Sequence, residues 1–174
     1  MNKTLIIFFS HKGETYFPTG YQMLDKGNAQ IIAETAQNIL GKNNTEIREI
    51  KTVHEYPQEY GYCCEMAERE QELNIFPALQ DYIDDIANYQ KIVLVFPCWY
   101  GTMPRAVFSL LKKHDLTNKD IYPICTHEGS GMGSSERDLK ETCPSANIHP
   151  GLAIRGHLAN TCEQDLRTYL TKNK

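Results

Sequence analysis

The sequence predicts an α/β fold with a parallel sheet that helices cover on both faces. Residues 5–9 (LIIFF) and 92–96 (IVLVF) are wholly apolar and lack the polar alternation of a half-exposed strand, which is typical of strands buried on both sides. Segments with the i, i+3, i+4 spacing of amphipathic helices lie between such runs, for example at residues 31–40. This alternation of buried strands and helices favours a single α/β domain with a parallel sheet over residues 1–174.

The first half of the chain divides into elements at glycine and proline residues. Gly27-Asn28 precedes the first helix, and Gly41 ends it. Isoleucines alternate with charged residues between residues 45 and 50, the pattern of an edge strand. Pro77 interrupts the helical pattern further along. The elements expected here are a strand at 5–9, a helix at 28–40, an edge strand at 45–50, a loop at 53–61 and one or two helices between 66 and 86.

The second half repeats the alternation of strand and helix. Pro104 suits the first turn of a helix, where its missing N–H group is tolerated. Asn160 or Thr161 is a suitable N-cap for the last helix. The elements expected here are a strand at 91–96, a helix after residue 104, a strand at 121–125, a helix around 138–143, a strand near 154 and a helix at about 162–170.

Three loops are expected to meet at one edge of this sheet. Right-handed crossovers place the carboxyl ends of all parallel strands on the same rim, and ligands of such sheets bind beyond those ends. The loops that follow the three buried strands cover residues 10–15, 97–103 and 126–133. The sequence therefore predicts the ligand site at this rim.

The first loop has the residue types of a phosphate site. Ser10 offers a hydroxyl, Lys12 a positive charge, and Gly13 a backbone that an anion can approach closely. The helix from Asn28 adds the positive end of its dipole. Two alternatives stay open here. Either the long insertion that follows the loop bulges outward and leaves this geometry intact, or the loop is an ordinary surface turn.

The second and third loops have the residue types of a site for a flat ligand. Trp99 and Tyr100, bounded by proline and glycine, favour a stacking surface, and the alternative is an aromatic pair packed on a neighbouring helix. In the third loop, glycines at every second position let the chain lie flat against a ring. His127 and Glu128 are interpreted as contact residues, with a solvated histidine as the alternative. Together the loops predict a planar ligand that carries one phosphate.

Composition and motifs exclude several other classes of protein. A hydrophobic fraction of 41% with 23% charged residues is that of a globular domain, and a net charge of −4 supplies no basic surface for nucleic acid. The six cysteines form no CxxC pair and no zinc-binding spacing, so reduced thiols are expected. No apolar segment is long enough for a bilayer or a signal peptide, which predicts a cytoplasmic protein without membrane contact. The fingerprints of triphosphate loops, dinucleotide loops and serine-hydrolase elbows are missing from the sequence.

Three stretches carry a resemblance to a known family: FPCWYGTMPRAVFSLL at 96–111, PICTHEGSGMGSSERDLK at 123–140 and CPSANIHPGLAIRG at 143–156. In these motifs and along nearly the whole chain, the sequence resembles flavodoxin-like FMN-binding proteins, in particular a bacterial subgroup with a long first loop. The resemblance implies a three-layer, doubly wound fold with a five-stranded parallel sheet of order 2-1-3-4-5, and FMN at the switch point between the first and third strands. The FMN-binding residues that it implies are Ser10, His11, Lys12, Gly13, Glu14, Thr15, Pro97, Cys98, Trp99, Tyr100, Gly101, Thr102, Thr126, His127, Glu128, Gly129 and Gly131.

Two departures from the family pattern concern the phosphate. Lys12 stands where the family often has a hydroxyl residue, and Ala29 stands where a threonine commonly opens the helix. Two of the usual hydroxyl donors are therefore missing. The positive charge of Lys12 is expected to compensate for them, because an ammonium group beside a phosphate in a partly dry site is strongly attractive.

The resemblance implies a flavoprotein in electron transfer. It is either a flavodoxin-type carrier for an unidentified partner protein or a reductase of small acceptors, such as an FMN-dependent NAD(P)H or quinone oxidoreductase. Carriers usually present a strongly acidic docking surface, so the mild net charge gives the reductase nearly equal support. The alternative is a flavodoxin-like interaction or regulatory module that has lost tight FMN binding. The aromatic insertion at residues 16–21 is interpreted as a cover over the flavin, a contact with a second subunit in a homodimer, or an ordinary packed surface loop.

Overall fold

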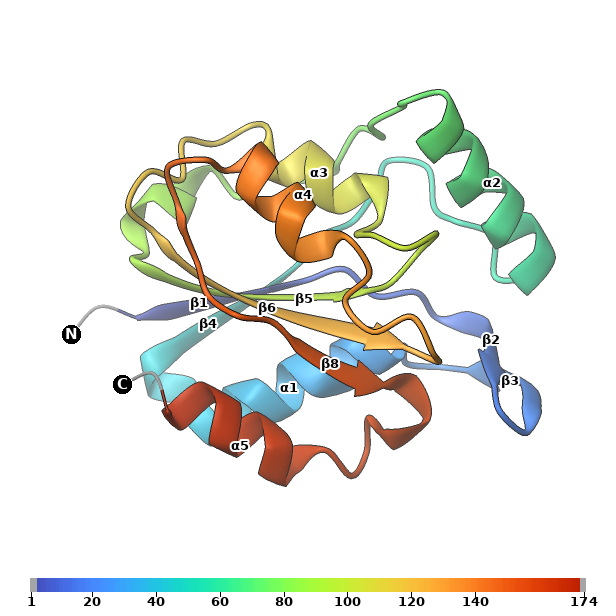
Figure 1. Ribbon diagram of the computed structural model, residues 1–174, viewed down its shortest axis with the longest axis horizontal. Helices are drawn as coiled ribbons and strands as arrows, with labels where there is room; N and C mark the ends of the chain where they lie inside the picture. The colour runs from blue at the N-terminus through green and yellow to red at the C-terminus, as the bar shows by residue number, and fades with distance from the viewer. Residues whose placement is uncertain (1–2, 173–174) are drawn as a thin grey trace.

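A computed structural model describes residues 3–172 as three layers, a central sheet with helices above and below it (Figure 1). Short 3₁₀ turns lie at Lys42–Asn44, Asp84–Asn88 and Gly156–Leu158. The strands are β1 (Thr4–Phe8), β2 (Gly13–Phe17), β3 (Gly20–Leu24), β4 (Thr45–Glu49), β5 (Lys91–Pro97), β6 (Asp120–His127), β7 (Asn147–Ile148) and β8 (Leu152–Arg155), and the helices are α1 (Asn28–Leu40), α2 (Tyr60–Glu72), α3 (Arg105–Leu111), α4 (Ser135–Thr142) and α5 (Glu163–Thr171).

The central sheet is parallel and confirms the predicted fold class. Its strands lie in the order β4-β1-β5-β6, and both β7 and β8 pair with the far side of β6. Numbered along the chain, this order is 2-1-3-4-5 with one difference. The fifth position is shared by two short strands, because Pro150 lies between them and has no N–H group to continue the ladder.

Alternate residues of the buried strands fill two separate cores. Leu5 and Ile7 of β1 pack on the side of α3 and α4, whereas Ile6 and Phe8 pack on the side of α1 and α5. Figure 1 shows these two pairs of helices on opposite faces of the sheet. Because side chains alternate between the faces of a strand, a strand buried on both faces needs a continuous apolar run. The fully apolar sequences of β1 and β5 are thus a direct consequence of the three-layer arrangement.

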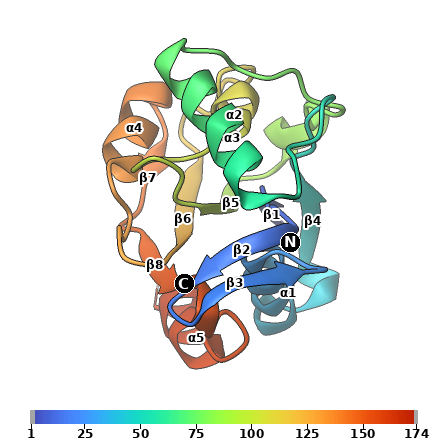
Figure 2. The ribbon, with the colours of Figure 1, turned by 90° about the vertical axis from the view of Figure 1, so that its right-hand side faces the viewer.

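The insertion after the first loop forms an antiparallel hairpin of β2 and β3 that projects from the rim (Figure 2). The hairpin begins at Gly13, so the prediction of a loop through residue 15 was wrong, and only residues 10–12 form the turn. The chain then returns with Gly27 against Ser10 and His11. Of the two alternatives for this region, the structure has the one in which the insertion bulges outward and the loop stays next to its helix.

Several element boundaries differ from the predicted ones. Helix α2 begins at Tyr60, inside the stretch expected as a loop, and only a 3₁₀ turn forms at Asp84–Asn88. Helix α4 begins at Ser135, three residues before the predicted start. Helix α5 begins after Cys162, and the hydroxyl of Thr161 donates instead to the carbonyl oxygen of Leu158. The predicted N-cap was therefore wrong, because that hydroxyl satisfies a preceding turn.

No helix in residues 3–172 has the length and apolar character needed to cross a membrane.

Candidate functional site

A cavity of about 360 Å³ opens at the rim where β1, β5 and β6 end. Its volume falls in the range of small-molecule sites. Three predicted loops, the first turn of α1, helix α2 and the β2–β3 hairpin surround it. The lining residues are Ser10, His11, Glu14, Thr15, Tyr16, Asn28, Ala29, Tyr60, Cys63, Cys64, Ala67, Pro97, Cys98, Trp99, Tyr100, Thr126, His127, Glu128 and Gly156.

The amino terminus of α1 faces this cavity with unused backbone donors. The hydroxyl of Ser10 accepts a hydrogen bond from the amide of Gln30 at 3.1 Å, which fastens the first loop to the first turn of the helix. The amide N–H groups of Asn28 and Ala29 donate to none of the described residues, although both residues line the cavity. Free N–H groups and the positive end of the helix dipole make this end of the cavity a site for an anion.

Gly27 is the residue that allows the loop and the helix to meet. A Cβ atom at this position would lie 2.2 Å from Oγ of Ser10 and 2.3 Å from the carbonyl oxygen of His11. Both distances are far shorter than any ordinary contact of a methyl group. The glycine is therefore required by the close approach of two backbones, which is one of the uses of a residue without a side chain.

The imidazole of His11 closes the cavity floor as a neutral group. Its Nε2 donates to the carbonyl oxygen of Pro57 at 2.8 Å. Burial lowers the pKa of His11, and the hydrogen bond to Pro57 opposes that effect only in part. The side chain thus holds the loop before α2 in place and supplies no positive charge to a ligand at neutral pH.

A tight turn presents Trp99 and Tyr100 at the rim. The amide of Trp99 donates to the carbonyl oxygen of Thr102 at 2.8 Å, and the amide of Thr102 donates back at 3.2 Å. Tyr100 and Gly101 have φ values of 49° and 77°, so the two central residues are both left-handed, as in a type I′ turn. Tyr100 adopts this unfavourable conformation without being glycine. Its hydroxyl donates to the carbonyl oxygen of Cys64 at 3.0 Å, which joins the turn to α2.

The ring of Trp99 is part of the core as well as of the cavity wall. It meets Phe9 and Tyr56 edge to face, with ring centroids 5.2 and 5.0 Å away, and lies 6.0 Å from the ring of His11. Edge-to-face contacts at such distances are favourable. These aromatic contacts are with residues of two loops and not with a neighbouring helix, as the alternative had it, and Trp99 also lines the cavity.

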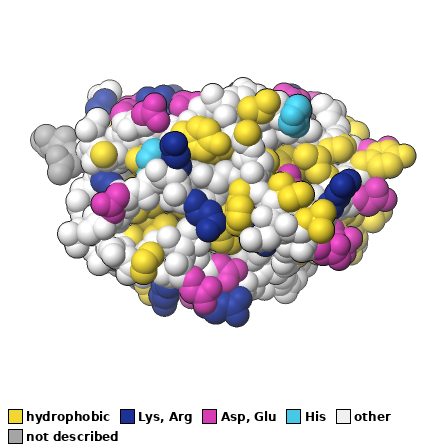
Figure 3. All heavy atoms as spheres, turned by 90° about the horizontal axis from the view of Figure 1, so that it is seen from above, with side chains coloured by type: hydrophobic (Ala, Val, Ile, Leu, Met, Phe, Trp, Pro, Cys, Tyr) yellow, Lys and Arg dark blue, Asp and Glu magenta, His cyan; other side chains and the backbone are white. Residues whose placement is uncertain are grey.

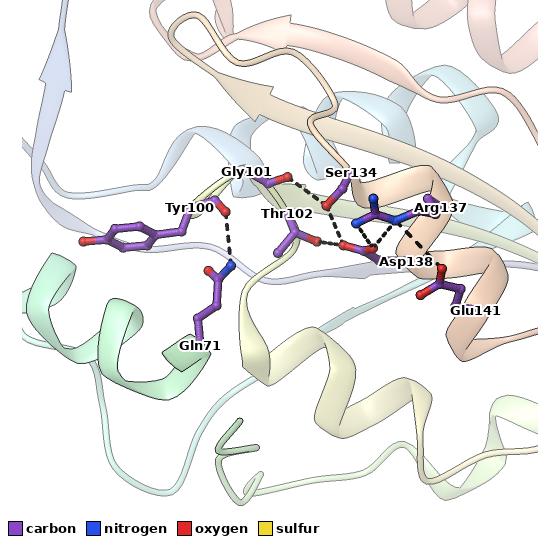
Figure 4. A network of polar contacts seen from close by, with 8 residues as sticks. All are labelled: Gln71, Tyr100, Gly101, Thr102, Ser134, Arg137, Asp138 and Glu141. Carbon is purple, nitrogen blue, oxygen red and sulfur yellow. Dashed lines mark hydrogen bonds and ion pairs between the residues drawn. The ribbon is translucent and has the colours of Figure 1, made fainter. Parts of the chain in front are cut away.

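Polar contacts bind the second loop to the third (Figure 4). The hydroxyls of Thr102 and Ser134 both donate to the carboxylate of Asp138, and the amide of Ser134 donates to the carbonyl oxygen of Gly101 at 2.7 Å. A Cβ atom on Gly133 would lie 2.1 Å from that same oxygen. Gly101 and Thr102 therefore fix the two loops to each other, and neither lines the cavity.

Glu128 lies at the cavity wall with its carboxylate engaged. It accepts from the amide and from Nδ1 of His157, each at 2.7 Å. The neighbouring His127 has its Nδ1 buried without a partner among the described residues, and burial lowers its pKa. A neutral His127 whose ring lines the cavity fits the contact role expected from the sequence.

The cavity is polar in places but contains no cationic side chain among its lining residues. The carboxylates of Glu14 and Glu128 are present, and the thiol of Cys98 adds to the negative character. A hydrogen bond from Cys125 lowers the pKa of Cys98 to about 6, with further help from Ser130 and the backbone of Gly101. An anion at this site is therefore held by backbone N–H groups and hydroxyls rather than by lysine or arginine.

Helix α2 and the hairpin form the outer wall of the cavity. The carboxylate of Glu14 accepts from the amide of Tyr60 at 3.0 Å and so caps the start of α2 from another element. The amide of Glu14 donates to the carbonyl oxygen of Gln58 at 2.7 Å. These bonds place Tyr60, Cys63 and Cys64 against the site, although the sequence predicted only a loop at 53–61 and one or two helices between 66 and 86.

Buried Tyr56 and Glu70 tie α2 to the body of the protein. The hydroxyl of Tyr56 donates to the carboxylate of Glu70 at 2.7 Å. Burial raises the pKa of Glu70, and the bond from Tyr56 and the charge of Arg105 oppose the rise. The folded state thus binds a proton on Glu70 more readily than the unfolded chain does, so the stabilisation from this group is present at low pH and is lost as pH rises through its folded pKa.

We expect Glu70→Gln to gain stability relative to the wild type as pH increases. The amide oxygen of glutamine still accepts from Tyr56, but no charge has to be buried. The difference in free energy of unfolding, variant minus wild type, should increase steadily from pH 4 to pH 8 in urea denaturation. The variant Glu68→Gln, which changes an exposed carboxylate on the same helix, is the control. A difference for Glu70→Gln that does not depend on pH would contradict this account.

The structure brings most of the predicted site residues to the cavity and leaves six outside it. Lys12 lies at a second, mostly polar hollow of about 380 Å³, beside residues that include Glu49 and Glu55. Lys12 does not line the cavity itself, and its place beside a phosphate stays a prediction. Those that line the cavity are Ser10, His11, Glu14, Thr15, Pro97, Cys98, Trp99, Tyr100, Thr126, His127 and Glu128, and those that do not are Lys12, Gly13, Gly101, Thr102, Gly129 and Gly131.

Eight lining residues were not among the predicted ones: Tyr16, Asn28, Ala29, Tyr60, Cys63, Cys64, Ala67 and Gly156. Asn28 and Ala29 could have been found, since the sequence already placed the start of a helix there. The residues of the hairpin and of α2 had no such signal, because long-range contacts bring them to the rim. All six cysteines are free, and the described residues contain no cluster of three or more side chains suited to a metal ion.

Comparisons with known proteins agree with this geometry. The family model described as flavodoxin matches residues 3–173. A putative flavoprotein from Bacteroides eggerthii has a similar fold, with a TM-score of 0.76 and 22% identity over 98% of this chain and 96% of that chain. One from Bacteroides uniformis has a TM-score of 0.76 and 20% identity over 97% of each chain. A flavoprotein in complex with FMN from Lactobacillus acidophilus has a TM-score of 0.68 and 21% identity over 92% of this chain and 97% of that chain. A comparison with curated protein sequences finds no match.

Proposed function

The chain belongs to the flavodoxin family, and on that premise we propose that it binds FMN in the rim cavity and passes electrons to a small acceptor. FMN is a flat ring system joined to a single phosphate. The cavity has a matching division, with an anion site at one end and aromatic rings at the other. The similarly folded flavoprotein from Lactobacillus acidophilus was obtained in complex with FMN, which supports the same choice of cofactor.

The observation that carries this proposal is the exposed amino terminus of α1. Its two free N–H groups face a cavity that contains no lysine or arginine, so they are the natural ligands of a phosphate. The hydroxyl of Ser10 accepts from Gln30 and donates its proton to none of the described residues, which leaves the proton for a phosphate oxygen. We therefore expect the missing family hydroxyls at Lys12 and Ala29 to cost little phosphate affinity, because backbone N–H groups take their place.

When bound, FMN supplies the ability to accept and donate electrons, and the protein adjusts how readily it does so. The carboxylates of Glu14 and Glu128 and the acidic thiol of Cys98 line the same cavity. Negative groups near a flavin disfavour additional negative charge on it. The site is therefore suited to a strongly reducing flavin.

The surface charge favours a reductase of small acceptors over a protein carrier. In Figure 3, Lys and Arg side chains are interspersed with Asp and Glu on the face that is seen from above. The net charge of the whole chain is only −4. A carrier that docks by charge needs a large region of one sign. A small acceptor needs only access to the cavity, which the rim provides.

Titration with FMN tests the proposal directly. We expect the purified protein to bind one FMN per chain, with quenched flavin fluorescence and shifted bands in the blue and near ultraviolet. After chemical reduction without oxygen, mixing with a small acceptor should reoxidise the flavin rapidly. Protein that leaves the spectrum and fluorescence of added FMN unchanged would refute the proposed function, and reoxidation only through a protein partner would replace the reductase by a carrier.

Ser10→Ala is expected to weaken FMN binding by about tenfold or more, because a hydrogen bond to a charged group contributes roughly 1.5–3 kcal/mol. The matched variant Lys12→Ala removes a full positive charge from the same turn, at an exposed residue that lines the second hollow and not the cavity. It should change the FMN dissociation constant by less than about twofold, since an exposed charge outside the site is screened. Fluorescence titration of both variants gives the comparison. If Lys12→Ala lost more FMN affinity than Ser10→Ala, Lys12 rather than Ser10 would be the main side-chain ligand of the phosphate.

A further inference from the structure

Four tyrosines lie along the outer side of the cavity and are named here the tyrosine wall: Tyr16, Tyr21, Tyr60 and Tyr100. Tyr16 and Tyr21 face each other across the hairpin, with ring centroids 5.8 Å apart, and Tyr21 lies 5.0 Å from the ring of Tyr60. Tyr16, Tyr60 and Tyr100 line the cavity. The wall therefore extends from the cavity to the tip of the hairpin.

The wall is held in place but left exposed, which is unusual for packing alone. Tyr16, Tyr21 and Tyr100 are 45%, 59% and 45% exposed. The elements that carry them are joined by hydrogen bonds, from the amide of Tyr60 to Glu14 and from the hydroxyl of Tyr100 to Cys64. Rings that served only the core would be buried. A fixed, exposed aromatic surface next to a ligand cavity is suited to stacking on a second ligand.

We propose that the tyrosine wall is the binding subsite for the electron acceptor, and that the acceptor is a flat, uncharged ring of the quinone class. This inference rests on the proposed function, because it needs FMN at the inner end of the cavity. Trp99, the loop after β6 and the start of α1 then hold the cofactor, while Tyr100, the hairpin and α2 hold the acceptor beside it. The insertion in the first loop thereby acquires a function.

The charges around the wall decide between acceptor classes. A nicotinamide dinucleotide brings a pyrophosphate, and the cavity lining has no lysine or arginine to neutralise it. Glu14 and Glu128 would repel such a group. A neutral ring meets no such barrier and gains the stacking energy of each tyrosine.

Tyr60 and Tyr100 keep their hydroxyl protons at neutral pH. Burial raises the pKa of Tyr60 to about 12, with a smaller effect from Cys64, and burial also raises the pKa of Tyr100. Tyr16 lines the cavity, and its hydroxyl makes no hydrogen bond with the described residues. It is placed to donate to a carbonyl oxygen of a quinone.

The reaction in this subsite is balanced by the cofactor alone. The acceptor ring takes up two electrons and two protons, so that its two C=O groups become C–OH groups. Bound FMN in its reduced form would supply both electrons and both protons and would leave the step as oxidised FMN, which dithionite reduces again in the experiment below. The cofactor in the cavity and the acceptor on the tyrosine wall would thus account for all the electrons and protons of this half-reaction.

Variants of the hairpin test the subsite, since Tyr21 does not line the cavity and Tyr16 lies at its mouth. Protein loaded with FMN and reduced with dithionite is mixed by stopped flow with 2-methyl-1,4-naphthoquinone or with ferricyanide, an acceptor that needs no binding subsite. We expect Tyr21→Ala and Tyr16→Ala to slow reoxidation by the quinone at least tenfold. Tyr21→Ala, which lies outside the cavity lining, should leave reoxidation by ferricyanide within twofold. Tyr62→Ala, on α2 but outside the cavity lining, should behave as the wild type with both acceptors.

Equilibrium binding gives a second measurement that needs no turnover. The redox-inert ring 2-naphthol should bind the oxidised, FMN-loaded wild type and the Tyr62→Ala protein, and bind Tyr21→Ala at least tenfold more weakly. Normal quinone rates and naphthol binding in both hairpin variants would overturn the subsite while leaving FMN binding intact. Equal slowing with quinone and ferricyanide would also overturn it, since the wall would then act on the flavin. Failure to bind FMN at all would refute the proposed function instead.

Discussion

Replacing Gly27 with alanine is expected to weaken FMN binding at least about 100-fold and to lower the free energy of unfolding by about 1–3 kcal/mol, the range for overpacking a tight contact. The added methyl group would lie 2.2 Å from Oγ of Ser10 and 2.3 Å from the carbonyl oxygen of His11. Neither neighbour can yield easily. One of these atoms belongs to the backbone, and the other is bonded to the first turn of α1.

The expected loss of FMN affinity is large because the clash would displace the first loop, which carries Ser10. To make room for a methyl group, the first loop must separate from α1, and this pulls the hydroxyl of Ser10 away from the two free N–H groups. A phosphate would then lose part of its ligand set at once, and each charge-assisted hydrogen bond contributes roughly 1.5–3 kcal/mol. Gly27 has a φ of −68°, so the backbone itself accepts alanine and the clash alone is tested.

Gly61→Ala is the matched control for this prediction. Gly61 lies in α2, and a Cβ atom there would have no other atom within 4 Å. Alanine is also the better helix former, so this variant should be as stable as the wild type or slightly more stable. Fluorescence titration with FMN and urea denaturation of both variants measure the two effects. Wild-type affinity in Gly27→Ala would show that the contact between loop and helix is not needed for the phosphate.

The parts of the fold that the sequence predicts well are those with a local cause. The apolar runs of β1 and β5 require burial on both faces, and their order with the intervening helices leaves few topologies. The helix α1 has an amphipathic face and a glycine at each end, so its bounds were close to those observed. The rim site follows from the parallel sheet itself, which is why three loops were placed together correctly without any knowledge of side-chain contacts.

The hairpin and α2 could not be predicted because their contacts are distant in the sequence. Glu14 caps α2 from 46 residues away, and Tyr100 is joined to Cys64 over 36 residues. Lys12 lies outside the cavity lining for the same kind of reason. A lysine in a polar turn is attractive as a phosphate ligand, but the start of β2 at Gly13 directs the chain outward immediately after it. The residue types of these segments were visible in the sequence. Their positions in space depend on contacts with residues far away in the chain, which the sequence does not show.

Trp99→Ala is expected to lower the free energy of unfolding by about 2–4 kcal/mol, somewhat below the usual loss for a fully buried tryptophan. The ring meets Phe9 and Tyr56 edge to face and lies close to His11, so its removal opens a hole behind the cavity wall. FMN binding should weaken as well, because the same ring lines the cavity. Trp99→Phe should retain much of the stability, since a smaller aromatic ring still meets both neighbours.

Tyr100→Gly is the comparison for Trp99→Ala, because it removes an aromatic ring from the cavity surface and not from the core. Tyr100 is 45% exposed and has a left-handed backbone, so glycine removes the ring and the strain together. Its free energy of unfolding should stay within about 1 kcal/mol of the wild type, because the lost hydrogen bond to Cys64 and the relieved strain have opposite signs. FMN titrations and urea denaturation of the two variants then distinguish two forms of the stacking prediction. If Trp99 were only a stacking platform, Trp99→Ala would lose FMN affinity at unchanged stability, whereas the observed contacts require both to fall.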